Sequence, residues 1–386
     1  MTDKMRLPSI IIVLLVLTSG RLASQESKIF TVNGYLTTMQ SATFDSLKGE
    51  IIYDNLIHNR VNMKLFPSKN ITIAAEFRNR LFTGDMVKTG NAYAEMIGYD
   101  QGWADLSWNL ASERSFLLNT TIDRLWIDYT SGKFQVTLGR QRINWGQTFV
   151  WNPNDIFNAY SFFDFDYVER PGSDAVRIQY FPNSSSTIDL ALKADNFGNI
   201  TAAGLYRFNK WGYDIQFLAG LVSGNDIVLG TGWSGSIGSL SFRGEVSFFD
   251  QYEDFPGDEG ALVATTGLEK VFSDNSMAQV QLMYSTDPMK LTGFSSFYSG
   301  TMSARNLAFS HFTAFGQYTW AITPLSNLGL SAMWFPDLKG YFAGPSFDYS
   351  VAENLDFSLI WQHFTSTVAD TRTRVNMAFL RIKYSF

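Results

Sequence analysis

Few residues of this chain have the type and spacing that catalysis requires. There are three histidines, His58, His311 and His363, and they fall in different segments without the spacing of metal ligands. There is no cysteine, which excludes disulfides and a lipid-modified N-terminal cysteine. No nucleophile elbow, zinc-protease motif or phosphate-binding loop occurs. The sequence therefore predicts no catalytic residue, no metal site and no cofactor, and an enzyme would need a histidine within reach of a Ser or Asp.

One stretch is distinctive: GRQRINWGQTFVWNPNDIFN, residues 139–158. The apolar parity of the preceding residues would place Arg140 and Arg142 on the same face as Leu138. Either a bulge at Gly139 shifts the phase, or these two arginines already lie at the outer rim of the barrel. The residues of this motif that could bind a solute are Arg140, Arg142, Trp145, Asn152, Pro153 and Asp155. The alternative is loop architecture, because Asn-Pro and Asp supply turn chemistry and arginines can tie a loop to its surroundings.

The composition is unusual for a secreted soluble protein. Aromatic residues make up 16% of the chain and charged residues only 17%, with a net charge of −6. After the N-terminal segment no run of about twenty apolar residues occurs, which argues against a transmembrane helix. Apolar residues spread one in two along strands are typical of a transmembrane β-barrel. The mildly acidic balance argues against nucleic-acid binding.

The N-terminus has the order of a secretory signal peptide. Lys4 and Arg6 precede the apolar run SIIIVLLVL, and small residues follow in TSGRLAS. We expect a signal peptide at 1–24, cleaved near Ser24, and a single barrel domain at 25–386.

Alternating hydropathy bounded by turn residues recurs along the whole mature chain. It predicts about 18 strands, with 16 as the alternative, in an antiparallel up-and-down barrel, since bacterial barrels have even strand numbers. The expected strands lie near 29–40, 56–66, 70–82, 121–130, 133–142, 173–182, 186–195, 200–209, 212–222, 225–235, 239–249, 261–272, 277–286, 306–320, 326–335, 340–350, 355–364 and 375–386.

The connections alternate in length. Every second link is short and rich in turn formers, such as PSKN, TSGK and FNKW, whereas the long links, near 41–55, 83–120, 143–172, 250–260, 287–305 and 365–374, fall on the other parity. Consecutive turns of a closed up-and-down barrel lie on opposite rims, so this sorting predicts short periplasmic turns and long outer loops.

Charge follows the same period of two. In 70–82, Ile71, Ile73 and Phe77 share one parity, and the charged side chains share the other. A cation facing lipid costs about 2–4 kcal/mol at mid-membrane, whereas one in a wet lumen costs little. The side chains expected to line the pore are Glu76, Arg78, Arg80, Arg124, Asp128, Arg177, Lys193, Arg207, Arg243, Glu245, Arg381 and Lys383.

The link near 143–172 is long and aromatic, and it contains the run AYSFFDFDYVERPG. We expect it to fold into or over the pore mouth, where buried surface offsets its ordering cost. The pattern GRQRxxWG…NPxDxFN resembles one shared by a family of porin-like Gram-negative outer-membrane barrels, most of them uncharacterised. These are distantly similar to alginate-export and other substrate-selective porins. The resemblance implies an 18-stranded pore and carries over no catalytic residue.

Two functions follow as expectations. The first is a passive pore that mildly prefers anions and admits small polar solutes or acidic saccharides, because the expected lumen leans positive. The second is a binding or assembly protein whose aromatic outer loops, 91–108 and 157–167, hold a surface polysaccharide or partner. The other partners expected are outer-membrane lipid and lipopolysaccharide, and the barrel-assembly machinery, because the chain ends on the alternating strand MAFLRIKYSF with a terminal aromatic.

Overall fold

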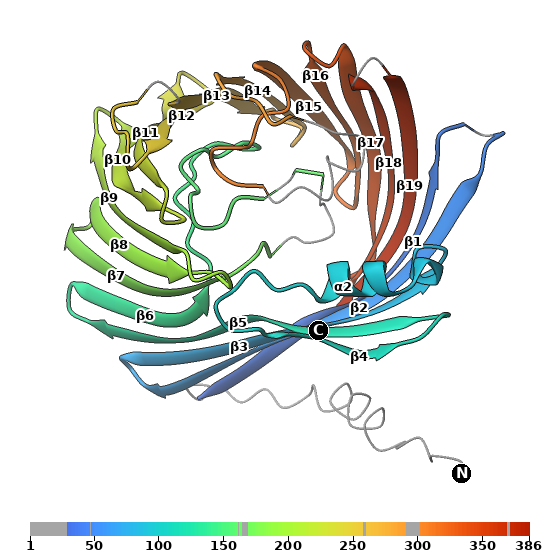
Figure 1. Cartoon of the computed structure of the whole chain (residues 1–386), viewed down its shortest axis with the longest axis horizontal. Coiled ribbons are helices and arrows are strands. Elements are labelled where there is room, and N and C mark those ends of the chain that lie inside the picture. Colours follow the sequence, from blue (N-terminus) through green and yellow to red (C-terminus); the bar gives the residue numbers. More distant parts are fainter. Residues whose placement is uncertain are drawn as a thin grey trace.

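The structure, a computed structural model, describes residues 29–386 except 47, 161, 164–168, 258–259, 291–301 and 369–370. The predicted signal peptide at 1–24 and parts of the aromatic run at 157–167 lie outside the described residues. Nearly all described secondary structure is β-strand, and the strands form one antiparallel sheet that closes on itself (Figure 1).

Eighteen strands make up the ring, which confirms the prediction of an 18-stranded barrel. They are β1 (Phe30–Phe44), β2 (Ile51–Ser68), β3 (Ile71–Gly84), β5 (Leu117–Ser131), β6 (Phe134–Gln141), β7 (Ser173–Asn183), β8 (Ser186–Ala194), β9 (Ile200–Lys210), β10 (Tyr213–Val222), β11 (Asp226–Ile237), β12 (Leu240–Gln251), β13 (Ala261–Val271), β14 (Met277–Ser285), β15 (Phe312–Thr323), β16 (Ser326–Phe335), β17 (Gly340–Ala352), β18 (Leu355–Val368) and β19 (Thr371–Ser385).

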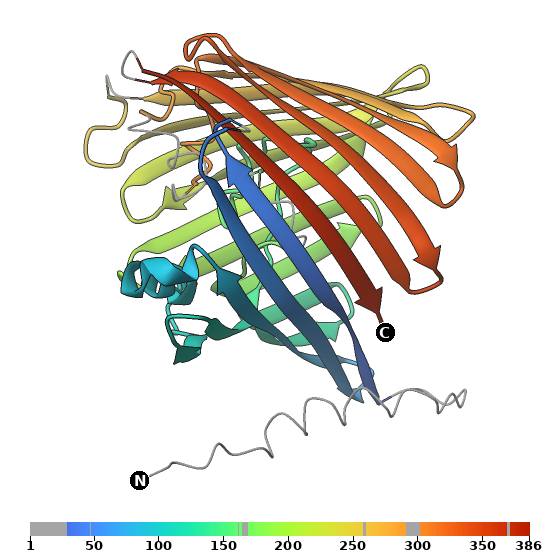
Figure 2. The ribbon, with the colours of Figure 1, turned by 90° about the vertical axis from the view of Figure 1, so that its right-hand side faces the viewer.

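The first and last strands close the ring, and they lie side by side in Figure 2. At the end of this seam, Gly34 and Phe386 exchange backbone hydrogen bonds of 2.9 Å in both directions. A Cβ at Gly34 would meet the carbonyl oxygen of Arg60 at 2.1 Å and the Phe386 ring at 2.9 Å, so only glycine fits there. Closure leaves no unpaired strand edge along this seam.

The two ends of the barrel differ. At one end, which we call the turn rim, strands such as β2 and β3 or β9 and β10 are joined by two residues. The opposite end, the loop rim, carries the long connections, including 85–116, 142–172 and 286–311. The long connections lie at one rim, as predicted from the sequence. The long links expected near 41–55 and 365–374 were wrong, because β1 extends to Phe44, β2 begins at Ile51, β18 extends to Val368 and β19 begins at Thr371.

The prediction was wrong within the link expected at 83–120. It contains the 3₁₀ helix η2 (Val87–Thr89), the helix α2 (Asn91–Gly98) and a further strand, β4 (Ser107–Ser112). β4 pairs with the loop-rim half of β5, where β6 has already ended, so a six-residue strand escaped a search for longer alternation. The strand expected at 306–320 also begins later, at Phe312. Among the described residues, no helix is long and apolar enough to cross a membrane.

Alternation sorts the two faces of the wall. In β5, Leu125, Ile127 and Tyr129 are 44%, 43% and 50% exposed on the outside of the barrel. Arg124 and Asp128, of the opposite parity, face the lumen and are 5% and 7% exposed. The outer surface is therefore apolar and the lumen polar, the inverse of a soluble protein and the arrangement of a lipid-facing barrel.

Candidate functional site: the lumen and its folded loop

The loop between β6 and β7, residues 142–172, enters the lumen from the loop rim, and Figure 1 shows its green trace within the ring of strands. Its first half runs along the inner wall, where polar side chains of the strands bind its backbone. Such buried backbone groups need partners, and here the partners come from strands that are far away in the sequence.

Glu245 of β12 is the central anchor of this loop. Its side chain is fully buried, and its carboxylate accepts the backbone N–H groups of Gln147, Thr148 and Asn154, the last two at 2.8 and 2.9 Å. Hydrogen bonds to an ionised acceptor are stronger than those between neutral groups. The predicted pore-lining residue Glu245 thus lies on the lumenal wall but is covered by the loop.

Three other wall side chains extend this anchoring on both sides of Glu245. Gln281 of β14 accepts the N–H of Val150 at 2.8 Å and donates to the carbonyl of Trp151 at 3.1 Å. Gln216 of β10 donates to the carbonyl of Trp145 at 2.7 Å. The indole N–H of Trp145 in turn donates to Asp189 of β8 at 3.0 Å. The loop is therefore fixed to the wall from β8 to β14.

Aromatic side chains hold the second half of the loop. Phe163 packs edge-on against Phe342 and Phe364 with ring centroids 5.3 and 4.7 Å apart, and Phe162 packs against Phe315 at 5.2 Å. Burying a Phe side chain contributes about 1.5–3 kcal/mol, so this cluster stabilises the inward position of the loop. The segment 302–310 between β14 and β15 also packs into it, through Phe309 among others.

Arg140 lies on the outer side of the wall. The ladders of β6 with β5 and β7 run through Gly139 without a register shift, so there is no bulge there and Arg140 keeps the parity of Leu138. Arg140 is nevertheless 5% exposed, because it binds Asp174 at 2.7 Å and Asp100 at 2.6 Å. For Arg140 the second explanation, a position at the outer rim, is the one that holds, because it stands at the loop-rim end of β6. Arg140 ties the 99–106 segment to the loop rim.

The other motif residues lie inside the loop. Asn152 accepts the Thr148 hydroxyl at 3.2 Å, and the carbonyl of Pro153 accepts the Ser247 hydroxyl at 2.9 Å. With Trp145 bonded to Asp189, these contacts are to the loop and the wall, as the loop-architecture interpretation predicts. A direct role in binding a solute stays a prediction for them.

Asp155 and Arg142 form the least satisfied part of the motif. Asp155 is 1% exposed, and its carboxylate oxygens have no hydrogen-bond partner, although the N–H groups of Trp145 and Asn158 face them. Burial raises the pKa of Asp155 to about 7, and the Glu245 carboxylate adds to this shift, while the Arg142 charge opposes it. Near neutral pH this carboxyl group is therefore partly protonated.

A buried ion network that the sequence did not predict holds the C-terminal end of the loop. Arg60 of β2 is 0% exposed and pairs with Asp123 of β5, with Glu76 of β3 and, at 3.8 Å, with Glu169 of the loop. Arg78 also approaches Asp123, at 3.3 Å. Several acids around one buried arginine compensate its charge. Removing any one member of the network would leave the remaining buried charges unbalanced, which destabilises the fold.

The sequence could have placed one part of this network but not the other. Arg60 shares its parity with His58 and Asn62, so alternation could have placed it in the lumen. Asp123 stands at a register shift between β3 and β5, where Glu76 pairs with Arg124 and the next pair begins at Ile122. This bulge turns Asp123 and Arg124 to the same side, which strict alternation does not anticipate.

All the side chains expected to line the pore lie on the lumenal parity of their strands, but they differ in their partners. Several cations bind neutral groups. Arg207 donates to Gln216 Oε1 at 2.7 Å, Lys193 donates to the carbonyl of Phe157 at 2.9 Å, and Arg243 lies 4.7 Å from the Phe149 ring centre. Arg80 donates to Asn119 Oδ1 at 2.7 Å, and Arg124 to the carbonyls of Glu169 and Arg170.

The acids at mid-height are neutralised instead. Asp189 binds Arg177 at 3.0 Å, Glu76 binds Arg60, and Glu245 is surrounded by backbone N–H groups. Toward the turn rim, further acids face the lumen. Asp128 accepts the Thr137 hydroxyl at 2.6 Å.

The lumenal cations of β19 lie beside such acids. Arg381 donates to Ser358 Oγ at 3.2 Å, and the same hydroxyl donates to Asp348. Lys383 lies opposite Asp356 in the ladder of β18 and β19, with its ammonium 4.4 Å from the Tyr35 ring centre. Lys193 of β8, Arg207 of β9 and Arg243 of β12 thus contact neutral groups directly, although acids such as Asp155 and Asp189 act on the first two from farther away.

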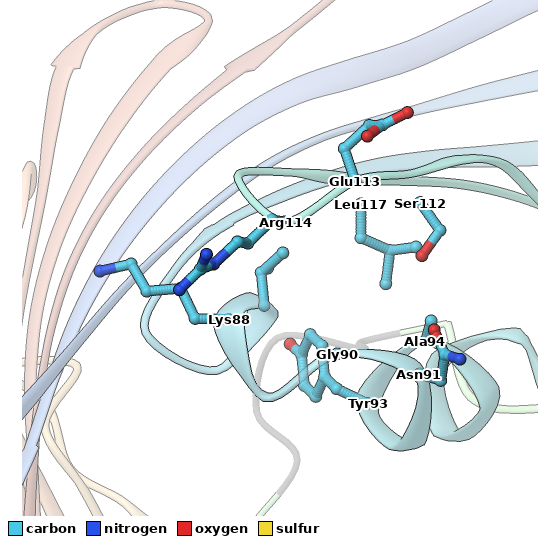
Figure 3. A pocket seen from close by; sticks show the side chains of 10 residues that line it. Lys88, Gly90, Asn91, Tyr93, Ala94, Ser112, Glu113, Arg114 and Leu117 are labelled. Carbon is cyan, nitrogen blue, oxygen red and sulfur yellow. The ribbon is translucent and has the colours of Figure 1, made fainter.

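A separate pocket of about 220 Å³ lies at the loop rim between η2, α2 and the connection from β4 to β5 (Figure 3). Its floor is apolar, with Val87, Ala94 and Leu117 buried, and Lys88 and Arg114 stand at its edge.

Tyr93 forms one side of this pocket, and its ring packs edge-on against Phe82 with centroids 5.9 Å apart. Burial, together with the nearby Asp54 charge, raises the pKa of Tyr93 to about 12. The phenol therefore stays neutral at physiological pH and can donate a hydrogen bond.

Nothing in the described structure assembles a catalytic or metal centre. His311 contacts Asp337 at 2.6 Å, but among the described residues no Ser or Thr hydroxyl is bonded to its ring. The described residues also contain no cluster of three potential metal ligands.

Comparisons with known proteins agree on the fold. No protein-family model matches the sequence, and no curated protein sequence matches it. The chain is similar in structure to a BenF-like porin from Pseudomonas fluorescens Pf-5, with a TM-score of 0.60 and 10% identity over 93% of this chain and 99% of the other. For OccAB2 of Acinetobacter baumannii the TM-score is 0.58 and the identity 8%, over 94% of this chain and 99% of the other. For OccK7 (OpdD) of Pseudomonas aeruginosa the TM-score is 0.56 and the identity 7%, over 93% of this chain and 99% of the other. At these identities the likeness shows the 18-stranded porin fold.

Proposed function

We propose that this chain is a Gram-negative outer-membrane pore for the passive diffusion of small polar solutes, with a mild preference for anions or acidic saccharides. An apolar outer surface around a charged lumen is what a barrel needs in lipid. In this proposal the turn rim faces the periplasm, the loop rim faces outward, and the chain acts without a catalytic residue or cofactor. Similarity in fold to porins supports the proposal.

The observation that carries the anion preference is the unequal pairing of lumenal charge. Arg207, Lys193 and Arg243 directly contact neutral groups, whereas the lumenal acids Asp189 and Glu245 are bound by an arginine or by backbone N–H groups. Uncompensated cations lining a pore attract anions and repel cations. The acids near the turn rim, such as Asp128, moderate this field, so the expected preference is mild.

Purified protein in planar lipid bilayers tests both parts of the proposal. We expect discrete conductance steps and, under a tenfold KCl gradient, a reversal potential on the chloride side of zero. Steps with a reversal potential on the potassium side would overturn the anion preference alone. If no conductance appears, the same measurement on a chain lacking residues 146–168 separates a lumen closed by the loop from a barrel that is not a pore.

A second candidate function has its own support at the loop rim. Tyr99 and Trp103, which follow α2 in the same connection, are 52% and 72% exposed. The same connection contains the pocket that Tyr93 and Arg114 line (Figure 3). Exposed aromatic rings next to polar groups suit sugar stacking, so this rim could hold a surface polysaccharide. Retention of labelled polysaccharide on cells, without solute flux in liposomes, would favour this function over the pore.

A further inference from the structure

The outer surface of the barrel carries an apolar groove of about 550 Å³ across β1, β2 and β16 to β19. One cross-strand row explains its shape: Tyr53 pairs with Ala42, Ala42 with Ala378, and Ala378 with Trp361. The two aromatic side chains are 57% and 48% exposed, and two alanines lie between them. Strands lie about 4.8 Å apart, so the rings stand about 14 Å apart over a floor of methyl groups.

Beside this row the groove is lined mainly by apolar side chains, and Gln40 of β1, opposite Leu380, is its polar neighbour. Leu359 and Leu380, paired in the ladder of β18 and β19, line it below, and Pro345 of β17 lines its far side. A hydrocarbon chain is about half as wide as the gap between the two rings. In a membrane, such a groove either holds ordered acyl chains or forfeits dispersion contacts with its walls.

Basic side chains stand above the groove on the same face. Arg374 and Arg372 share the outward parity of Ala378 on β19, and both are exposed. Arg374 is four residues nearer to the loop rim than Ala378, a distance of about 13 Å along a strand. Arg372 makes one long hydrogen bond, of 3.5 Å, to Thr365. The carboxylate of Asp45, at the end of β1, turns into its own connection toward Gly49.

We propose that this face binds lipopolysaccharide, with an acyl chain of its lipid in the groove between Tyr53 and Trp361 and its phosphates on Arg372 and Arg374. The inference rests on the proposed function, which places the loop rim in the outer leaflet. The apolar floor of the groove and the guanidinium groups of Arg372 and Arg374 are about as far apart as the acyl chains and the phosphates of a membrane lipid. Arginine forks suit phosphate oxygens, and a neutral phospholipid headgroup would not satisfy two adjacent arginines.

The test uses the whole barrel purified from outer membranes in mild detergent, with native mass spectrometry and thermal unfolding as readouts. Three proteins are compared with the wild type. R372Q together with R374Q removes the charges, and Ala378→Trp fills the groove. Lys270→Gln, at the turn rim on the outer face, is the matched control because its ammonium contacts only Ser239 Oγ, at 3.0 Å, and the Phe272 ring, 5.8 Å from the ring centre, both far from the groove.

We expect the wild type and the Lys270→Gln variant to retain about one lipopolysaccharide and to unfold at a higher temperature when purified rough lipopolysaccharide is added. The arginine variant and Ala378→Trp should each bind it about tenfold more weakly. Equal binding by all four proteins, equal stabilisation by phosphatidylethanolamine, or a dimer that occupies the face instead would overturn the inference. Because the face lies outside the lumen, conductance is measured in parallel. If the wild type shows no conductance, the proposed pore is overturned. If the wild type conducts but all four proteins bind lipopolysaccharide equally, only the lipid site is overturned.

Discussion

Thr148 donates its backbone N–H to the carboxylate of Glu245 at 2.8 Å, although the two residues are 97 positions apart in the chain. The same carboxylate accepts the N–H of Asn154 at 2.9 Å. A single wall side chain therefore holds two points of the lumenal loop, and the width of the lumen depends on this anchor.

Replacing Glu245 by Gln should loosen the loop. The amide has one acceptor oxygen and no charge, and each hydrogen bond to a charged group contributes about 1.5–3 kcal/mol. We expect larger and noisier single-channel conductance and faster cleavage of the 142–172 loop by added protease. Asp356→Asn is the control, because this lumenal acid accepts only the Ser350 hydroxyl, at 2.8 Å. Identical channels in the two variants would contradict the anchoring role.

Removing two of the lumenal cations that directly contact neutral groups should reduce anion selectivity. In the double variant Arg207→Gln and Arg243→Gln, we expect the reversal potential under a salt gradient to move toward zero, because fewer lumenal cations then outweigh the lumenal acids. Lys210→Gln, whose ammonium lies over Trp211 at the turn rim, should leave it unchanged. A shift of equal size in both variants would point to surface charge rather than lumenal charge.

The docked loop should be less stable at higher pH. Burial raises the pKa of Asp155 to about 7, whereas an unfolded aspartate titrates near about 3.9. The folded protein thus binds this proton more tightly, so its contribution is fully present below about pH 4 and is lost as pH rises through about 7. Asp155→Asn should flatten this dependence, measured by thermal unfolding between pH 5 and 8. A wild-type stability that rises over this range would contradict the assignment.

The 99–106 segment should detach from the wall when the ion pairs of Arg140 with Asp100 and Asp174 are broken. A Cβ at Gly102 would meet Arg140 Nη2 at 1.9 Å and Asp174 Oδ2 at 2.5 Å, so Gly102→Ala forces the segment off the ion pair. When chymotrypsin is added to intact cells, we expect it to cleave this variant after Tyr99 and Trp103 several times faster than the wild type. Gly90→Ala is not a suitable control because of its positive φ, whereas Gly316→Ala meets nothing within 4 Å. Equal rates of cleavage of the two variants would show that the ion pairs of Arg140 do not hold the segment.

Closure of the barrel should depend on Gly34. An added Cβ there meets the backbone oxygen of Arg60 at 2.1 Å, so Gly34→Ala must displace β1 or β2. We expect a smaller fraction of folded, heat-modifiable protein on gels, and the same defect when Phe386, which shares two backbone bonds with Gly34, is deleted. Gly316→Ala is again the control. A full yield of folded Phe386-deleted protein would also remove the proposed role of the C-terminal strand in recognition by the assembly machinery.

The sequence by itself determined the class of fold, the 18 strands of the ring and the face on which most strand side chains lie. A period of two reports which side of a sheet a residue occupies, and link lengths report which rim it is near. This was enough to place Arg207 and Arg243 in the lumen and Phe386 at the closing seam. It failed at β4, which is too short to show a period, and at Asp123, where a bulge breaks the period.

Only the tertiary structure decided what the lumenal side chains do. Parity gives neither the height of a residue in the barrel nor its neighbours around the ring, because these depend on strand tilt and stagger over the whole closed sheet. Glu245 was expected to line the pore and is instead covered by the loop it holds, and Arg60 lies in a buried ion network drawn from three strands and a loop. Contacts between positions so distant in sequence arise from closure of the ring, which no local pattern encodes.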